Sequence, residues 1–110
     1  MFISWSDFEK IDIRLGTILE VQDFPKARKP AFQLVIDFGE AGIKKSSAQI
    51  TDLYSKEELA GRQVIVILNF PPKQIANFNS ECLVLGVYTP NNEVVLLQPD
   101  RPVKNGSKIG

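Results

Sequence analysis

Apolar and polar residues alternate over much of this chain, and the alternation predicts strands. The first strand is expected from about Asp12 to Asp23. Gly16 lies in its middle, where a glycine indicates a bulge or a bend, so that one long strand can contribute to two sides of a small barrel. One face of this strand should consist of Ile13, Leu15, Thr17, Leu19 and Val21.

The second and third strands follow as a meander. Residues 32–38 show the clearest alternation in the chain, and a turn over residues 39–42 leads into a third strand over residues 43–50. Alternate side chains of a strand share a side, so only one of two sets in the third strand can face a ligand. The two sets are Lys45, Ser47 and Gln49, and Lys44, Ser46 and Ala48.

Between Thr51 and Gly61 the spacing becomes helical, and Ser55 with Glu58 forms a capping box. A buried strand over residues 64–68 and two short strands over 82–85 and 94–97 complete the pattern. The predicted fold class is all-β, a five-stranded oligonucleotide/oligosaccharide-binding (OB-fold) barrel with one short inter-strand helix and short N- and C-terminal extensions. A length of 110 residues predicts a single domain over residues 1–110.

The composition excludes several kinds of catalytic and metal-binding site. With no His and one Cys, the chain has no Ser-His-Asp or Cys-His nucleophile, no imidazole metal site, no zinc cluster and no internal disulfide. Cys82 lies in an apolar strand pattern and is expected to be an inert core residue. We therefore predict no enzyme activity, no catalytic residue, no metal and no cofactor.

The first ten residues lack the basic flank and apolar run of a signal peptide, and no stretch reaches the ~20 apolar residues of a membrane span. We expect no membrane insertion and a cytoplasmic location.

The 13 basic and 13 acidic residues cancel, but they are unevenly distributed. Residues 1–25 are mainly acidic and residues 26–49 mainly basic, which allows a local positive surface on a neutral protein. A nucleic-acid-binding surface is predicted on the first loop, the third strand and one further lysine; ordinary solvated side chains are the alternative. Its residues are Lys26, Arg28, Lys29, Lys44, Lys45, Ser47, Gln49 and Lys73.

A second candidate surface is apolar and rich in proline. Pro71 pushes Phe70 into an extended conformation, so residues 70–72 form a stiff ledge that suits an unfolded polypeptide. The alternative is that Phe70 and Phe78 close the end of the core. The predicted peptide-binding residues are Phe24, Phe70, Pro71, Pro72, Ile75 and Phe78.

Phe2, Trp5 and Phe8 crowd the start of the chain, where a soluble monomer normally carries polar residues. Their spacing fits a short helix capped by Ser4 or Ser6. The apolar side of this helix must pack either on a partner subunit or on its own barrel. We interpret residues 1–10 as a dimerisation extension, with Phe2, Trp5 and Phe8 at the interface of a homodimer.

Several ordered motifs resemble the tRNA-binding domains that are appended to methionyl-tRNA synthetases and also occur as free-standing tRNA-binding proteins. They cover nearly the whole chain: residues 8–18 (FEKIDIRLGTI), 46–50 (SSAQI), 59–64 (LAGRQV) and 69–75 (NFPPKQI). The last motif, with residues 80–86 (SECLVLG) and 96–100 (LLQPD), is similar to the CsaA group of small bacterial export-related chaperones. Synthetase-type domains typically read Ser-Glu-Gly-Met where this chain has Ser80-Glu81-Cys82-Leu83.

The resemblance implies an OB-fold homodimer that acts as a molecular chaperone for unfolded preproteins in protein secretion. It implies preproteins as partners, with the translocation motor as a further candidate partner. The alternative function is structure-specific tRNA binding on the same face of the barrel.

Overall fold

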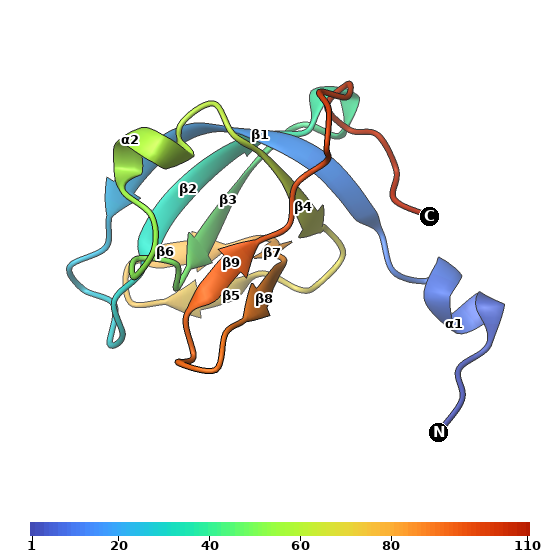
Figure 1. Cartoon of the computed structure of the whole chain (residues 1–110), viewed down its shortest axis with the longest axis horizontal. Helices are drawn as coiled ribbons and strands as arrows, with labels where there is room; N and C mark the ends of the chain where they lie inside the picture. The colour runs from blue at the N-terminus through green and yellow to red at the C-terminus, as the bar shows by residue number, and fades with distance from the viewer.

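The computed structural model describes all 110 residues and shows a small barrel from which the N-terminal helix projects (Figure 1). The helices are α1 (Trp5–Glu9), the 3₁₀ turn η1 (Gly39–Ala41) and α2 (Lys56–Leu59). The strands are β1 (Ile13–Asp23), β2 (Phe32–Asp37), β3 (Ile43–Ala48), β4 (Gln63–Ile67), β5 (Lys73–Ile75), β6 (Phe78–Ser80), β7 (Leu83–Val84), β8 (Gly86–Tyr88) and β9 (Val94–Leu96). No helix is long and apolar enough to span a membrane.

Five antiparallel strands in the order β3-β2-β1-β4-β7 form the barrel, and two hairpins, β5-β6 and β8-β9, extend it. The expected all-β OB-type architecture is therefore confirmed, with α2 between β3 and β4. The β5-β6 hairpin was not predicted, because the prolines before it resemble a loop.

The long strand β1 serves two sides of the barrel, as predicted. Its first half pairs with β4 and its second half with β2, and the change occurs at Thr17. The bulge lies at Leu19 and not at Gly16, because the register shifts between Ile18 and Glu20. The inward face is therefore the opposite of the predicted one at this point: Ile18 is fully buried and Leu19 is exposed.

The main core lies between the barrel strands and α2. Phe32, Leu34 and Ile36 of β2 are buried, as their alternation predicts, and Leu59 of α2 caps the core. The predicted capping box is present, since the Ser55 hydroxyl accepts the Glu58 N–H and the Glu58 carboxylate accepts the Ser55 N–H. The hydrogen bond that the Ser55 backbone N–H donates to the carboxylate lowers the pKa of Glu58.

The barrel closes between β3 and residues 80–82 mainly through side chains. The Lys45 N–H donates to Glu81 Oε1 (2.9 Å), and the Ser47 N–H donates to Ser80 Oγ (3.0 Å). The buried Ser46 hydroxyl donates to the carbonyl of Cys82 (2.9 Å). This seam holds β7 in place at the far edge of the sheet.

The C-terminal segment completes the free edge of β1. Leu15 N–H donates to the Ser107 carbonyl, Gly106 N–H donates to the Leu15 carbonyl, and Ile109 N–H donates to the Ile13 carbonyl. The Gln63 side chain also bonds both backbone groups of Val103. Residues 103–109 therefore act as a further short edge of the barrel.

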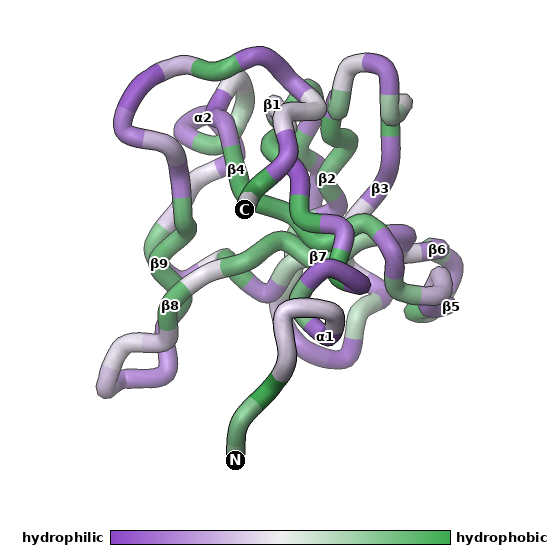
Figure 2. Tube along the Cα trace, turned by 90° about the vertical axis from the view of Figure 1, so that its right-hand side faces the viewer, coloured by the Kyte–Doolittle hydropathy of each residue, from purple (hydrophilic) through white to green (hydrophobic).

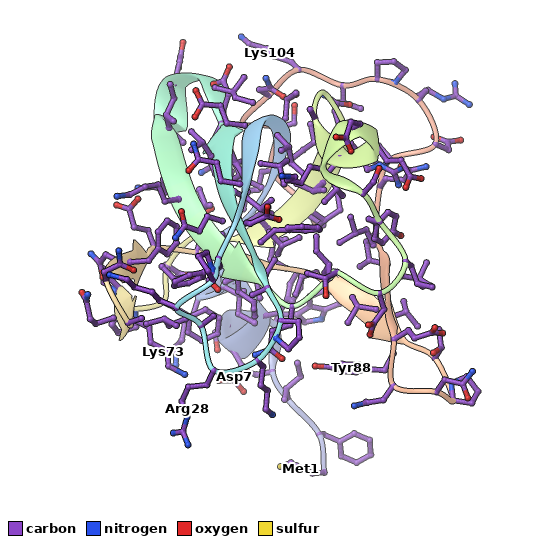
Figure 3. The ribbon with its side chains drawn as sticks, turned by 90° about the vertical axis from the view of Figure 1, so that its left-hand side faces the viewer. Met1, Asp7, Arg28, Lys73, Tyr88 and Lys104 are labelled. Carbon is purple, nitrogen blue, oxygen red and sulfur yellow. The ribbon has the colours of Figure 1, made fainter.

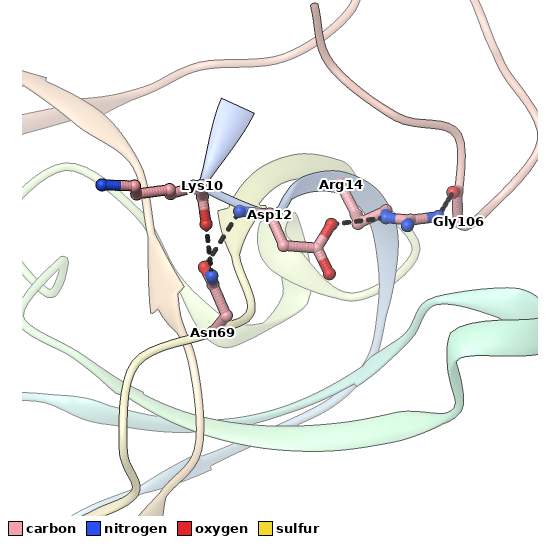
Figure 4. A network of polar contacts seen from close by, with 5 residues as sticks. All are labelled: Lys10, Asp12, Arg14, Asn69 and Gly106. Atoms are coloured by element: carbon pink, nitrogen blue, oxygen red, sulfur yellow. Dashed lines mark hydrogen bonds and ion pairs between the residues drawn. The ribbon is translucent and has the colours of Figure 1, made fainter. Parts of the chain in front are cut away.

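A polar network fixes the base of the N-terminal extension (Figure 4). The Asn69 side chain accepts the Asp12 N–H (2.9 Å) and donates to the Lys10 carbonyl (2.6 Å). The Asp12 carboxylate in turn accepts from Arg14 Nε (2.7 Å), and Arg14 donates to the Gly106 carbonyl. The network links both ends of the chain to Asn69, the residue directly before the Phe70 ledge.

Candidate binding site

Two grooves meet on one face of the barrel. An apolar groove of about 720 Å³ runs between β3 and the segments around β5, β7 and β8, and a basic groove of about 840 Å³ lies beside the loop that joins β1 to β2. Both are within the size range of ligand pockets in proteins. The grooves share Ser47, Gln49, Lys73 and Ile75, so they form one continuous surface.

The apolar groove is built from exposed rings and aliphatic side chains. Phe70 is 53% exposed and Tyr88 is 75% exposed, and both line this groove with Pro71, Leu83 and Val94. The predicted ledge is therefore partly present, since Phe70 and Pro71 line the groove. Pro72 is exposed but does not line it.

The ledge is held firmly at its base. Pro71 removes the helical option from Phe70, and the preceding residue, Asn69, is fixed by its two hydrogen bonds to the segment before β1. Because little backbone freedom is left at Phe70, the ledge loses little backbone entropy when it contacts a ligand.

The basic groove is lined by Lys26, Arg28 and Lys29 of the first loop and by Lys73 of β5. Figure 3 shows Arg28 and Lys73 together at one end of the molecule, with Lys104 at the opposite end. These charges are exposed, so each is screened by salt and attracts an anion only weakly alone. Together they form a cationic border to the apolar groove.

The structure decides which side of β3 faces the ligand surface. Ser46 and Ala48 are buried, whereas Ser47 and Gln49 line both grooves and Lys45 is exposed on the same side. The Lys45 ammonium lies 5.5 Å from the centre of the Phe78 ring. Lys44 and Lys45 line neither groove, so the predicted basic set is only partly brought together.

Two of the predicted peptide-binding residues, Phe24 and Phe78, do not expose their rings. They are only 5% and 8% exposed, and their ring centres lie 5.4 Å apart in a small second core with Ala31. The prediction that Phe24 and Phe78 form an exposed apolar surface is therefore wrong, because their rings pack on each other. The alternative prediction, that Phe70 and Phe78 close the end of the core, is correct for Phe78 and wrong for Phe70. This second core supports the first loop and the β5-β6 hairpin beneath the basic groove.

The predicted short N-terminal helix forms with Ser4, one of the two candidate caps, at its start, and it contains Trp5 and Phe8 while Phe2 precedes it. A hydrogen bond from the Ser4 backbone lowers the pKa of Asp7, the other partner in this capping box. The helix buries no residue: Phe2 is fully exposed, Trp5 is 81% exposed, and Phe8 is half-buried. Figure 2 shows the apolar start of the chain projecting away from the barrel. The single chain leaves these rings uncovered.

Sequence reasoning missed the contribution of the last hairpin to the apolar groove. The predicted strands over 82–85 and 94–97 carry no predicted ligand role, yet Leu83 of the first and Tyr88, which lies between them, line the groove. Residues 82–97 contain more apolar side chains than the core can bury, and this excess is the signal in the sequence that could have indicated the groove. In the β8-β9 ribbon, Leu96 faces the core, while the paired Val87 and Val95 are exposed.

The prediction that Cys82 is a buried residue is confirmed. Burial raises the pKa of the Cys82 thiol to about 11, so the thiol is neutral at physiological pH. Its Sγ donates weakly to the Lys45 carbonyl at 3.6 Å, within the seam. No group of three or more His, Cys, Asp and Glu side chains is placed to hold a metal ion.

A five-stranded barrel with a helix after its third strand and grooves along its strands is an OB-fold binding module. Comparisons with known families match residues 13–108 to the family described as "Putative tRNA binding domain". The chain belongs to this tRNA-binding domain family and, within it, to the CsaA group.

Two solved structures support this assignment over the full length of the chain. The chaperone CsaA of Bacillus anthracis is 48% identical, with a TM-score of 0.94 and full coverage of both chains. The CsaA chaperone protein of Picrophilus torridus is 55% identical, with a TM-score of 0.93 and coverage of 99% of this chain and 100% of that one.

Curated relatives include larger enzymes. The methionine–tRNA ligase of Nanoarchaeum equitans is 38% identical over 107 residues, which are 97% of this chain but 13% of that protein. The chain thus corresponds to one small domain of such ligases.

Proposed function

We propose that this protein is a non-catalytic molecular chaperone that binds extended, unfolded polypeptide. The observation that carries the proposal is the apolar groove, in which the exposed rings of Phe70 and Tyr88 stand beside the cationic border at Lys73. An unfolded client offers apolar side chains that a preformed apolar groove can bind without reorganisation. The CsaA structures of similar length and high identity are chaperones by name, which supports this choice.

The groove proposal is tested by the aggregation of a heat-unfolded model protein, followed by light scattering. Phe70→Ser and Tyr88→Ser should each reduce the protective effect, because each removes an exposed ring from the groove. Ile43→Ser is the matched control, since Ile43 is 62% exposed but lines neither groove. Equal protection by all three variants and the unchanged protein, each shown to be folded by circular dichroism, would disprove a role for this groove.

The basic groove supports tRNA binding as a second candidate function. Four cations, Lys26, Arg28, Lys29 and Lys73, line it, and the matched family model is that of a tRNA-binding domain. If tRNA is the ligand, affinity should fall steeply with salt, and Arg28→Ala should flatten the slope of log affinity against log salt by about one phosphate contact. Lys104→Ala, at the opposite end of the molecule, is the control (Figure 3).

We place the chaperone in the cytoplasm, acting on preproteins before export and with the translocation motor as a partner. Support for this setting comes from the resemblance of the chain to the CsaA group. A pull-down with the purified motor ATPase, in the presence and absence of an unfolded preprotein, tests it. Failure to retain the motor under either condition would remove the motor from the proposal and leave the groove proposal unaffected.

A further inference from the structure

The outer edge of β3 is the feature from which we infer how a client binds. In the β2-β3 ladder, Phe38 N–H donates to the Gly42 carbonyl, so even-numbered residues of β3 direct their backbone groups toward β2. Alternate residues of an edge strand direct theirs the other way. The N–H and C=O groups of Lys45 and Ser47 therefore point outward from the sheet, and the burial pattern continues the same alternation through Gln49, directly after β3.

Most of this edge is already sealed. Glu81 accepts the Lys45 N–H through its side chain and donates its own N–H to the Lys45 carbonyl (2.8 Å). Ser80 Oγ accepts the Ser47 N–H. These bonds to residues 80 and 81 do not continue beyond the Ser47 N–H.

The next two groups along the edge have no comparable partner. The Gln49 N–H makes no hydrogen bond to backbone or side chain, and the residue is exposed. The Ser47 carbonyl is approached only by the Ser46 hydroxyl at 3.5 Å, and that hydroxyl makes its shorter bond, 2.9 Å, to Cys82. Ser47 of β3 and Gln49, directly after the end of β3, are also shared by the two grooves. An acceptor and a donor two residues apart on an open strand edge match the backbone of an added strand.

We propose that a client polypeptide adds as a short β-strand to this open edge, pairing its backbone with the Ser47 C=O and the Gln49 N–H. Its apolar side chains then lie in the groove beside Phe70 and Tyr88. The inference rests on the proposed chaperone function and states how that site recognises its client. Backbone pairing is independent of sequence, so one groove can accept many unfolded segments.

This edge favours polypeptide over nucleic acid. Phosphate groups carry acceptors only, and the donors of RNA are 2′-hydroxyls and base edges with no fixed spacing from an acceptor, whereas an extended peptide supplies both an N–H and a C=O at the required spacing. Phosphate binding would instead rest on the lysines and Arg28 of the basic groove, away from this backbone pair.

The first test uses a labelled, end-capped ten-residue peptide of serines with Phe at its fifth position and Leu at its seventh, so that the two apolar residues set its register. Single backbone N-methyl groups are introduced along it, one peptide at a time, and binding to the intact protein is measured by fluorescence anisotropy. Methylation of the one client N–H that donates to the Ser47 carbonyl should weaken binding about tenfold, and methylation of the other N–H groups should have little effect, giving a single sensitive position. A flat profile would overturn the strand-addition proposal.

The second test changes the protein. Gln49→Pro removes the N–H, while Gln49→Ala keeps it and removes the same side chain, so the pair isolates the backbone donor. Ala48 is already extended, as the residue before a proline prefers. We expect Gln49→Pro to bind the peptide about tenfold more weakly than Gln49→Ala. Urea unfolding checks that both variants are folded.

The outcomes separate this inference from the proposed function. Peptide binding with a flat N-methyl profile, or equal binding by the two Gln49 variants, overturns strand addition alone. No peptide binding by the unchanged protein, with or without binding of a tRNA transcript, overturns both.

Discussion

Single residues control this barrel where two elements approach closely. Gly16 of β1 lies against the ring of Phe38 and the side chain of Ile36, and a Cβ atom placed on it would lie 2.6 Å and 2.7 Å from their atoms. Both neighbours are fully buried, so neither can move freely. Gly16 is therefore required for close packing across the barrel, and the nearby bulge at Leu19 supplies the bend.

Gly16→Ala should lower the free energy of unfolding by about 1–3 kcal/mol, because an added methyl group forces the core apart. Urea unfolding followed by circular dichroism measures this change. Gly110→Ala is the control, since nothing lies within 4 Å of the Cβ it would add. A Gly16→Ala variant as stable as the control would contradict the packing argument.

Cys82 gives a prediction that depends on pH. Burial raises the pKa of its thiol from the usual value of 9.0 to about 11, so between these pH values the unfolded chain releases a proton that the folded protein retains. The folded state should lose stability as pH rises through this interval, and Cys82→Ala should lose less. Urea midpoints at pH 8 and pH 10 measure the difference, and parallel losses in the two proteins would count against a buried, protonated thiol.

At the scale of elements, the C-terminal segment acts as an edge strand although its sequence has no strand pattern. It satisfies the free edge of β1 through backbone bonds to Ile13 and Leu15, and it is further held by Gln63, Arg14 and Thr17. Thr17 Oγ1 donates to Asn105 Oδ1 at 2.7 Å. The segment thus connects the end of the chain to the strand at the centre of the sheet.

Removal of residues 103–110 should lower the free energy of unfolding by at least about 2 kcal/mol, because several backbone hydrogen bonds are lost together. The amide of Leu15, which donates to Ser107, should then exchange rapidly with solvent in hydrogen-exchange measurements. Deletion of Gly110 alone serves as the control. An unchanged urea midpoint after the larger deletion would show that the segment contributes nothing to the fold.

At the scale of the whole molecule, we expect the exposed aromatic rings at the N-terminus to be covered by a partner. Phe2 and Trp5 are exposed, but α1 has a capped start and its base is fixed by Asn69. A fixed, exposed apolar helix is a typical contact between subunits. We therefore propose a homodimer in which this extension packs on a second copy of the chain.

Light scattering should give twice the chain mass of 12.3 kDa, and the double variant Phe2→Ser, Trp5→Ser should give the single mass. Since Trp5 is the only tryptophan, its emission reports directly on this contact. We expect blue-shifted emission that moves to the red on dilution. A single-chain mass with red-shifted emission at all concentrations would exclude the dimer through this surface.

The sequence alone determined the elements whose signals are local. The alternation in β2, the capping box at Ser55 and a serine cap on the N-terminal helix depend only on neighbouring residues, and each is present in the structure. Loop positions of Lys26, Arg28 and Lys29 follow from the flanking prolines, so their exposure was predictable. The resemblance of ordered motifs identified the family, which the comparisons confirm.

Tertiary structure decided which side chains are available to a ligand. Phe24 and Phe70 look equivalent in sequence, but one pairs with Phe78 in a second core and the other stands on the groove. Ser80 and Glu81, more than thirty residues away in the chain, seal the outer edge of β3 and leave it open only at the Ser47 C=O and the Gln49 N–H. Exposure and edge pairing depend on contacts between distant segments, and no local pattern encodes those contacts.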